Sequence, residues 1–592
     1  MGLQSFRSCS VLCLIVYTAG CSIQTPVPIG ITVSPQSATL TPGQTIQFVA
    51  SVTDTLTGIT STATTENNAT GVTWSVTAGT IDASGRYTAP EGPQGRTVVV
   101  TASGVDPIKA ANATLHVVAP GKVSPTANPQ VALYSIAAGA PGNVSVQFGL
   151  DTNYGLRTWT QPAPAGGATN VLVAGMKAST PYHMRAVVQF GDGTEFTDTD
   201  HLFTTGALDP AQAPTITTST TPGMTPQSGV ELLDLVSGNA RPTIADLLGN
   251  VLWTYDAVPN GTQPNPIKLL PNGHFLINFS EQTLDGLDSV IQEVDLTGTL
   301  IWQMTASDLN TALAAATCAG CNITVVGTHH DFVLLPNGHL IVIAATQQDI
   351  SGTTVLGDVI IDLDQNHTPV WLWNEFDHLD VNRQPMGFPD WTHTNAILYS
   401  PDDGNLIVSI RHQNWLIKVD YANGTGAGDI LWKLGYQGDF ALLGGTDPTD
   451  WFYAQHGPSF VTANTTGQFS MALFDNGDDR VFPSGVTCGS TGAPPCLYST
   501  VPLLELDETA KTATLAFHPT APMYSFFGGN AAVLENGDVE FCEAAGGSNE
   551  TSGIIYEVTH DSSAQTVWQM QVAAQYVYRG QRIPSLYPGV QW

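Results

Sequence analysis

Histidines recur at the same place in a repeated pattern of strands in the C-terminal part of the chain. His330, His393 and His456 each stand at the start of a repeat, Arg411 directly follows one of the strands, and Asn395 is close to His393. An imidazole has an ordinary pKa of about 6.5, so at neutral pH it can attack as a nucleophile and later leave. Arginine and hydrogen-bond donors stabilise negative charge. These five residues predict a site that holds an anionic ligand, with a histidine as candidate nucleophile.

Each of these histidines, taken alone, also has a structural explanation. A His-Asp pair such as His330 and Asp331 can brace a strand, and an isolated loop histidine such as His456 is usually a surface residue. Three further histidines follow turn or strand signals and are assigned to structure: His274, His339 and His412. The coincidence of three register-matched histidines with an arginine and an asparagine favours a functional anion site over these structural explanations.

Two alternating phrases indicate the elements that must position these side chains. One is a turn followed by a strand, as in LLPNGHFLI at Leu269 and LLPNGHLIVI at Leu334. The other is a strand, an acidic residue, a turn and a strand that carries an aromatic residue; its six copies contain Trp253, Trp302, Trp373, Trp432, Phe517 and Trp568. Spacings of roughly 50–85 residues fit four-stranded sheets that bury their faces against their neighbours. Residues 225–592 are therefore predicted to form a six-bladed β-propeller, in which equivalent positions converge on the axis.

Composition agrees with an all-β protein and excludes several classes of function. Of the 592 residues only 11% are charged and 42% are hydrophobic, while 58 Gly and 38 Pro suit many short strands joined by turns. The net charge of −32 excludes electrostatic binding to nucleic acid or to an anionic bilayer. Disorder of the whole chain is excluded as well, because the supply of core residues is ample.

The N-terminus is expected to be an export signal. Residues 1–20 combine Arg7 with a short apolar stretch, VLCLIV, and end in small residues before Cys21. Ala-Gly-Cys resembles a bacterial lipobox, although Thr18 stands where Leu is usual, so Cys21 is the predicted lipidation site. The expected location is extracytoplasmic, either periplasmic or anchored in the outer membrane, with ordinary secretion as the alternative. Any membrane attachment is expected through the lipid alone.

Two small β modules are expected before the propeller. Residues 28–118 contain VTWSVTAGTIDASGRYTAP, which resembles bacterial Ig-like repeats in which Trp74 packs between two sheets. Residues 119–206 contain STPYHMRAVVQFGDGTEF, which looks like a fibronectin type III strand pair. A Thr- and Pro-rich linker over 207–224 is expected to separate these modules from the propeller.

Cysteine usage suits an oxidising compartment. Cys488 and Cys496 bracket a loop and predict a local disulfide, Cys318 and Cys321 predict a second one, and Cys542 is expected to be buried and free. No zinc site is predicted, because no second CxxC or paired His completes four ligands. Residues 475–479, DNGDD, suggest at most a weak calcium loop, so no metal is predicted.

The motifs, taken in order, resemble those of the bacterial arylsulfate sulfotransferases. The matching segments are HHD-F-LLPNG, DW-HTN, SIRHQ-IKVD, QHG and the C-terminal YRGQRIPSLYP. The resemblance implies His456 as the nucleophile and sulfate contacts at His330, His393, Asn395 and Arg411. The family's disulfide shortly before the catalytic histidine has no counterpart, since no cysteine lies between residues 321 and 456.

The implied activity is transfer of a sulfuryl group from an aryl sulfate to a phenol, in ping-pong fashion through a sulfohistidine. His330, held by Asp331, is the candidate acid that protonates the departing phenolate. No cofactor is implied. A nucleotide sulfate donor is not implied either, because no phosphate-binding Gly loop follows a strand. The expected partners are small aryl sulfates and phenols. Two alternatives stay open: a lipoprotein whose propeller only binds an anion, and a propeller hydrolase with water as acceptor.

Overall fold

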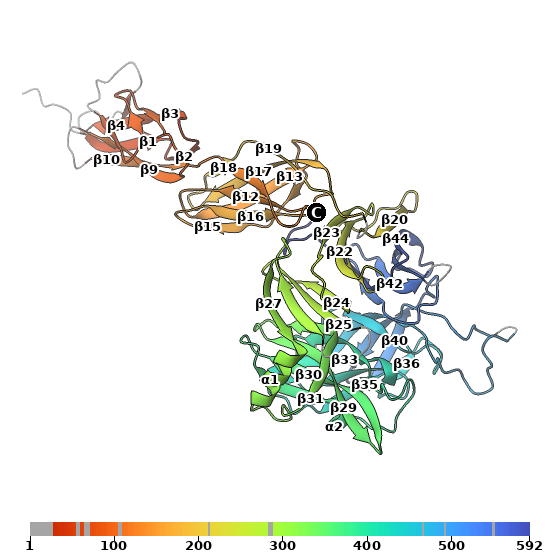
Figure 1. Ribbon diagram of the computed structural model, residues 1–592. Coiled ribbons are helices and arrows are strands. Elements are labelled where there is room, and N and C mark those ends of the chain that lie inside the picture. The colour runs from red at the N-terminus through yellow and green to blue at the C-terminus, as the bar shows by residue number, and fades with distance from the viewer. Residues whose placement is uncertain are drawn as a thin grey trace, which may run out of the picture.

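Short strands joined by turns dominate the residues that the computed structural model describes (Figure 1). The structure describes residues 28–54, 60–63, 72–104, 109–210, 213–281, 288–464, 467–490, 493–546 and 551–592. The α-helices in these ranges are α1 (Ala306–Ala315) and α2 (Glu375–His378), and neither could span a membrane. The all-β class is therefore confirmed. The predicted signal segment 1–20 and the lipidation site Cys21 lie outside the described residues.

The first β module is built from three small sheets around an apolar core. The sheets are β1 (Pro28–Ser34), β4 (Val49–Asp54) and β5 (Thr60–Ala63); β2 (Ser37–Leu40), β10 (Ala110–Val117), β9 (Arg96–Ser103) and β6 (Thr73–Val76); and β3 (Thr45–Gln47), β8 (Arg86–Thr88) and β7 (Thr80–Ile81). Trp74 is partly buried, and its ring centroid lies 6.2 Å from that of Phe48 in this core.

The second β module has two facing sheets. They are β11 (Lys122–Pro125), β12 (Ala132–Ile136) and β16 (Thr169–Val173); and β14 (Leu156–Arg157), β13 (Gly142–Gly149), β17 (Pro181–Phe190) and β18 (Glu195–Thr197), with β15 (Gln161–Ala163) on β13 and β19 (His201–Thr204) on β17. Alternate residues of β13 and β17 are buried, which is the period expected when one face of a sheet covers a core.

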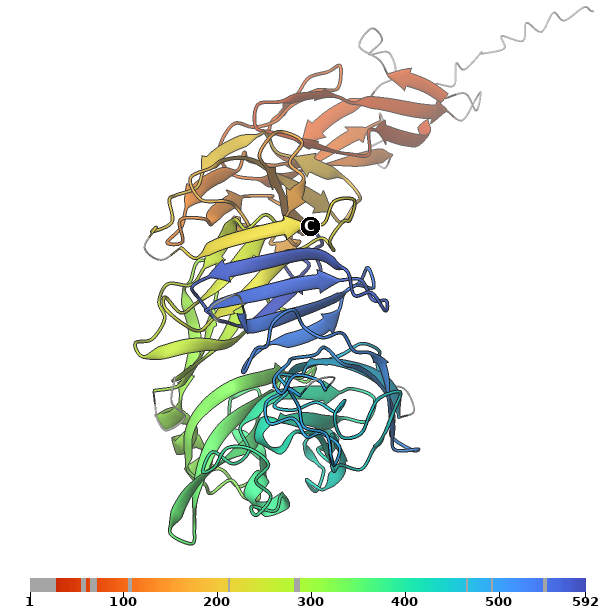
Figure 2. The same ribbon diagram turned by 90° about the vertical axis from the view of Figure 1, so that its right-hand side faces the viewer.

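Six further sheets follow among the described residues from 213 onward, and Figure 2 shows them below the two modules. Each sheet is given in its order of paired strands. The first is β45 (Val577–Ile583), β21 (Val230–Leu235), β22 (Arg241–Asp246) and β23 (Val251–Thr254), and the second is β24 (Thr262–Leu269), β25 (Phe275–Glu281), β26 (Val290–Val294) and β27 (Leu300–Thr305). The third is β28 (Val325–Leu334), β29 (Leu340–Ile350), β30 (Thr353–Leu363) and β31 (Pro369–Asn374), and the fourth is β32 (Thr394–Ser400), β33 (Asn405–Ile410), β34 (Trp415–Val419) and β35 (Ile430–Leu434). The fifth is β37 (His456–Phe460), β38 (Gln468–Phe474), β39 (Leu503–Asp507), β40 (Thr512–Phe517) and β36 (Ala441–Leu443), and the sixth is β41 (Asn530–Val533), β42 (Val539–Gly546), β43 (Ser552–Val558), β44 (Thr566–Ala573) and β20 (Thr215–Thr220).

Strands from the two ends of this region pair with each other. The last strand, β45, pairs antiparallel with β21, and the first strand, β20, pairs antiparallel with β44. β20 lies inside the predicted linker 207–224, so residues 215–220 of that segment are part of a sheet.

The aromatic residue of each repeated phrase contacts a turn of the next sheet. The indole N–H of Trp253 donates to the Leu296 carbonyl at 2.8 Å, and that of Trp373 donates to the Gly428 carbonyl at 2.9 Å. The remaining contacts are Trp302 stacked on His367, Trp432 to Glu508, Phe517 against His560, and Trp568 to the Leu247 carbonyl. The last of these runs from the sixth sheet to the first. The closed six-bladed propeller itself stays a prediction.

The C-terminal tail fixes the second β module to this region. The Tyr587 hydroxyl accepts a hydrogen bond from the Ala174 N–H at 2.7 Å and donates to the Leu172 carbonyl at 2.9 Å. Gln130 bridges the same junction, because its amide nitrogen donates to the carbonyls of Met176 and Val251. The C-terminus accordingly lies beside the second module (Figure 1).

Both predicted disulfides are present. Cys318 is bonded to Cys321 and Cys488 to Cys496, while Cys542 is buried and free.

Replacing Tyr587 by Phe should destabilise the protein, because two buried backbone groups lose their partner. We expect the free energy of unfolding to fall by about 1–3 kcal/mol, measured by denaturant titration. Tyr399→Phe is the matched control, since the Tyr399 hydroxyl donates at 2.7 Å to Asn423 near the surface. An equal loss in both variants would contradict the role of Tyr587.

Candidate active site

The predicted histidines lie on the first strands of three successive sheets, β28, β32 and β37, or directly beside them. In each strand the pairing register shifts at the site, between Thr328 and Phe332 in β28 and at equivalent points in β32 and β37. His330, His393 and Ala454 have positive φ values of 59°, 50° and 53°. Non-glycine residues rarely adopt this conformation, and it turns the chain so that the side chains leave the normal alternation of the strand.

These bends bring the predicted residues together. The ring centroid of His330 lies 4.8 Å from that of His393, and both His330 and His456 contact the ring of Tyr578 from β45, at 5.6 and 5.8 Å. His330 and His456 are buried, with relative exposures of 8% and 1%.

Asn476 sets the tautomer of His456. The Asn476 amide nitrogen donates to the carbonyls of Ser525 and Gly528, so its oxygen must face His456 Nδ1, which lies 2.7 Å away. Ala454 also offers a carbonyl oxygen to this Nδ1, at 3.1 Å. Because both neighbours accept, Nδ1 carries the proton and Nε2 carries the lone pair. Nε2 accepts a hydrogen bond of 3.3 Å from the Gly528 N–H.

His456 is held neutral. Burial, followed by the positive charge of Arg411, keeps the pKa of His456 well below its ordinary value. At pH 7 the imidazole is therefore neutral and Nε2 keeps its lone pair, which is the state that a nucleophile requires.

Arg411 is clamped at the end of β33, where the short 3₁₀ turn Arg411–Gln413 begins. One terminal nitrogen donates to His412 Nε2 at 2.8 Å, and the other donates to Asp478 at 3.0 Å and to the Phe526 carbonyl at 3.1 Å. His412, assigned to structure from sequence, thus orients the guanidinium. The Arg411 Nε has no partner among the described residues.

Asn395 is buried on β32, and its amide nitrogen already donates to the Gln455 carbonyl at 2.7 Å. Its amide oxygen has no partner within the described chain. The backbone carbonyl of Asn395 accepts from Arg579 at 2.8 Å. In this structure the polar atom that Asn395 offers is therefore an acceptor, and donation to an anion would require the amide to rotate.

Asp331 does not hold His330, contrary to the sequence-based expectation. Its carboxylate pairs with Lys268 at 2.5 Å and with Arg579 at 3.2 Å. Although burial favours the protonated acid, these two cations lower the pKa of Asp331. The Nδ1 of His330 instead lies 2.7 Å from Nδ1 of His329. The positive φ at His330 explains the difference, because it separates the directions of adjacent side chains.

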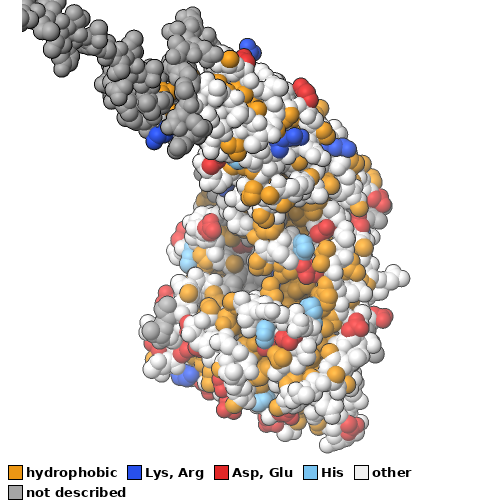
Figure 3. All heavy atoms as spheres, turned by 90° about the vertical axis from the view of Figure 1, so that its left-hand side faces the viewer, with side chains coloured by type: hydrophobic (Ala, Val, Ile, Leu, Met, Phe, Trp, Pro, Cys, Tyr) orange, Lys and Arg blue, Asp and Glu red, His pale blue; other side chains and the backbone are white. Residues whose placement is uncertain are grey.

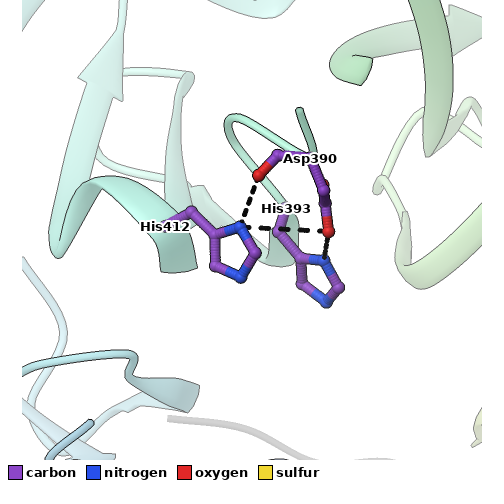
Figure 4. Close-up of side chains that lie close together, drawn as sticks. All are labelled: Asp390, His393 and His412. Carbon is purple, nitrogen blue, oxygen red and sulfur yellow. Dashed lines mark hydrogen bonds and ion pairs between the residues drawn. The ribbon is translucent and has the colours of Figure 1, made fainter. Parts of the chain in front are cut away.

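Asp390, His393 and His412 form a compact group of potential metal ligands (Figure 4). His393 Nδ1 lies 2.6 Å from the Asp390 carboxylate, and His412 Nδ1 lies 2.7 Å from the Asp390 backbone carbonyl. A carbonyl can only accept, so His412 Nδ1 carries a proton, while its Nε2 accepts from Arg411. Both nitrogens of His412 are therefore occupied, and the group fits a hydrogen-bonded chain better than a metal site.

Residues 475–479, which suggested a weak calcium loop, serve the site instead. Asp475 pairs with Arg480 at 2.5 Å, Asn476 orients His456, and Asp478 accepts from Arg411. These carboxylates already bind cationic side chains, so the segment does not present a set of free oxygen ligands.

Four residues of the site were not predicted from the sequence: Asn476, Tyr578, Arg579 and His329. Tyr578 and Arg579 are the first two residues of the C-terminal motif YRGQRIPSLYP, and His329 is the first histidine of HHD, so these motifs contained the signal. Asn476 lies in the DNGDD segment, which suggested at most a weak calcium loop and gave no sign of a contact with His456.

Several cations from residue 213 onward lie in buried ion pairs. Figure 3 shows few Lys and Arg side chains on the face that it presents. Lys418, Arg480 and Arg582 are buried and paired with carboxylates. Cavities lie beside β38–β40, at the junction around Trp592, and near His560.

Comparison with known proteins identifies the family. No curated protein matches the chain. Solved structures that resemble it include a putative 6-phosphogluconolactonase from Bacteroides uniformis (7% identity, TM-score 0.30, 75% of this chain and 99% of that chain) and the Yersinia pseudotuberculosis adhesin InvE (18% identity, TM-score 0.13, 38% and 72%). TM-scores this low carry no argument. The arylsulfotransferase (ASST) family model matches residues 219–579, which is more than half of the chain and includes every residue of the histidine site. The chain therefore belongs to the arylsulfotransferase family.

Proposed function

We propose that this protein transfers a sulfuryl group from an aryl sulfate to a phenol by a ping-pong mechanism, with His456 as the covalent carrier. Membership of the family indicates a sulfotransferase that acts on aryl sulfates and phenols. The observation that carries the finer proposal is the fixed tautomer of His456. Asn476 holds the proton on Nδ1, so the lone pair of Nε2 is available for attack.

Unpartnered donors around His456 support an anionic substrate. The Nε of Arg411, the Nε of Arg579 and the Tyr578 hydroxyl are buried and lack a partner among the described residues. Leaving a buried donor unpaired costs about 1–3 kcal/mol, which a bound sulfate oxygen would remove. Charge develops on the same oxygens in the transition state, so these donors would also accelerate transfer.

The proposed first half-reaction forms one bond and breaks one. The Nε2 lone pair attacks sulfur, the bond from sulfur to the aryl oxygen breaks, and the phenol leaves with that electron pair and a proton from His330. The Gly528 N–H, which now donates to Nε2, is released to donate to a sulfuryl oxygen. In the second half-reaction an acceptor phenol loses its proton, its oxygen attacks sulfur, and the N–S pair returns to Nε2.

The six sheets are proposed to be the blades of a closed propeller with this site at its axis. Support comes from the aromatic contact that each sheet makes with the next, including Trp568 to the Leu247 carbonyl, and from the pairing of β45 with β21. An extracytoplasmic location, with a lipid on Cys21, is proposed from the N-terminal sequence, and the two disulfides suit such a compartment.

His456→Ala should abolish transfer, because no neighbouring side chain can both attack and leave. We expect a loss of more than about 10³-fold in the rate with 4-nitrophenyl sulfate and phenol. Wild-type protein quenched with donor alone should carry the added mass of a sulfuryl group on the peptide that contains His456.

His339→Ala is the matched control. His339 lies outside the site, and its Nδ1 is 2.9 Å from the Asp362 carboxylate. A fully active His456→Ala protein would overturn the assignment. Release of sulfate at the same rate with and without phenol would identify a hydrolase instead.

The low pKa of His456 predicts a distinct pH dependence. Sulfurylation should stay constant as the pH falls from 8 through the ordinary histidine pKa, and should decline only at lower pH, where His456 gains a proton. Asn476→Asp would place a carboxylate beside Nδ1, favour the imidazolium and raise that pKa. The acid limb of the single-turnover pH profile should therefore move to higher pH in Asn476→Asp. A uniform loss at every pH, with the limb in place, would show that Asn476 acts only on folding.

A further inference from the structure

Two buried side chains, His329 and then Asp358, lead away from His330. Asp358 on β30 lies 3.0 Å from His329 Nε2, and His329 Nδ1 lies 2.7 Å from His330 Nδ1. Asp358 and His329 are each 2% exposed, so water does not compete for these contacts. The rings of His329 and His330 meet edge to face, with centroids 4.8 Å apart. The two imidazoles therefore share one proton between their Nδ1 atoms.

Asp358 determines which atom donates in the hydrogen bond between its carboxylate and His329. Its second carboxylate oxygen accepts from the Thr392 hydroxyl at 2.8 Å and from the Thr394 N–H at 2.7 Å. A carboxylate oxygen is an acceptor, so Asp358 accepts from His329 Nε2–H through its other oxygen. The neighbouring Glu375 is driven towards its neutral form, because burial and then Asp358 raise its pKa. The Asp358 carboxylate thus faces His329 Nε2 at hydrogen-bond distance and can accept its proton in that bond.

We propose that Asp358 and His329 form a proton store that allows His330 to act as the acid in the first half-reaction and as the base in the second. The inference rests on the proposed function. In the charged state of the store, His329 is protonated on both nitrogens and donates to His330 Nδ1, which leaves the His330 proton on Nε2. His330 Nε2–H then protonates the departing phenolate oxygen, while the His329 Nδ1 proton moves to His330 Nδ1.

The protons on His329 and His330 return to their starting positions over the two half-reactions. After the first, His329 is neutral with its proton on Nε2, and His330 is neutral with its proton on Nδ1. The acceptor phenol then gives its proton to His330 Nε2, and the Nδ1 proton returns to His329. No imidazolate forms at any point. His330 is neutral before and after each half-reaction, which agrees with its pKa, because burial and the neighbouring His393 hold that pKa well below its ordinary value.

The test uses His329→Asn. An asparagine amide can still donate to His330 Nδ1, but it cannot pass on a proton. Single-turnover sulfurylation of His456 is measured with a series of aryl sulfates, from nitrophenyl sulfates to phenyl sulfate, whose phenol has a pKa of about 10. We expect nearly wild-type rates with nitrophenyl sulfate, whose leaving group needs no proton, and a loss of about 10²-fold or more with phenyl sulfate.

His339→Asn is the matched control, because its His-Asp pair resembles His329–Asp358 but does not reach His330. It should leave the dependence on the leaving group unchanged. An equal loss for all donors in His329→Asn, or no loss with phenyl sulfate, would overturn the proton store. The nitrophenyl arm tests the proposed function separately: absence of sulfurylated His456 in the wild-type protein would overturn that function, whatever His329 does.

Discussion

The contact between the aromatic residue of one sheet and a turn of the next sheet sets the geometry on which the site depends. In four of the six positions an indole N–H is buried at this contact and donates to an oxygen of the next sheet: Trp253, Trp373, Trp432 and Trp568. A buried indole N–H without such a partner is unfavourable, so each bond fixes both the distance and the rotation between neighbouring sheets. His330, His393 and His456 come from three successive sheets, and their relative positions follow from these rotations.

Within that frame, the chemistry is governed by which nitrogen of each histidine carries a proton. His456 presents a lone pair because Asn476 accepts from its other nitrogen, and His412 accepts from Arg411 because a backbone carbonyl takes its proton. Asn476 and His412 are buried and the Arg411 side chain is only 14% exposed, so water competes little for these contacts. The few cations of the chain add to this arrangement, since Arg411 and Arg579 lie close enough to disfavour a charged His456.

The sequence was sufficient to predict the strand-rich class, the two disulfides and the meeting of His330, His393 and Arg411 with His456, because repeats place equivalent residues at equivalent points. It was not sufficient to predict side-chain partners. His330 was expected to bind Asp331, yet a positive φ sends these adjacent side chains to different neighbours, His329 and Arg579. Register shifts of this kind depend on tertiary packing and have no signature in the local pattern. Asn476 was missed for a related reason, since its role exists only when β38 and β37 are side by side.

The pairing of β45 with β21 has a consequence for the time at which the site is assembled. Tyr578 and Arg579 belong to the last strand of the chain, whereas its partner β21 is made about 350 residues earlier. The first sheet therefore lacks a strand until β45 has been synthesised, and the donors of Tyr578 and Arg579 join the site after its histidines. Contacts of such long sequence separation form slowly. A chain that ends between β37 and β45 keeps His456 but lacks the donors of Tyr578 and Arg579, so the site is complete only once β45 has paired with β21.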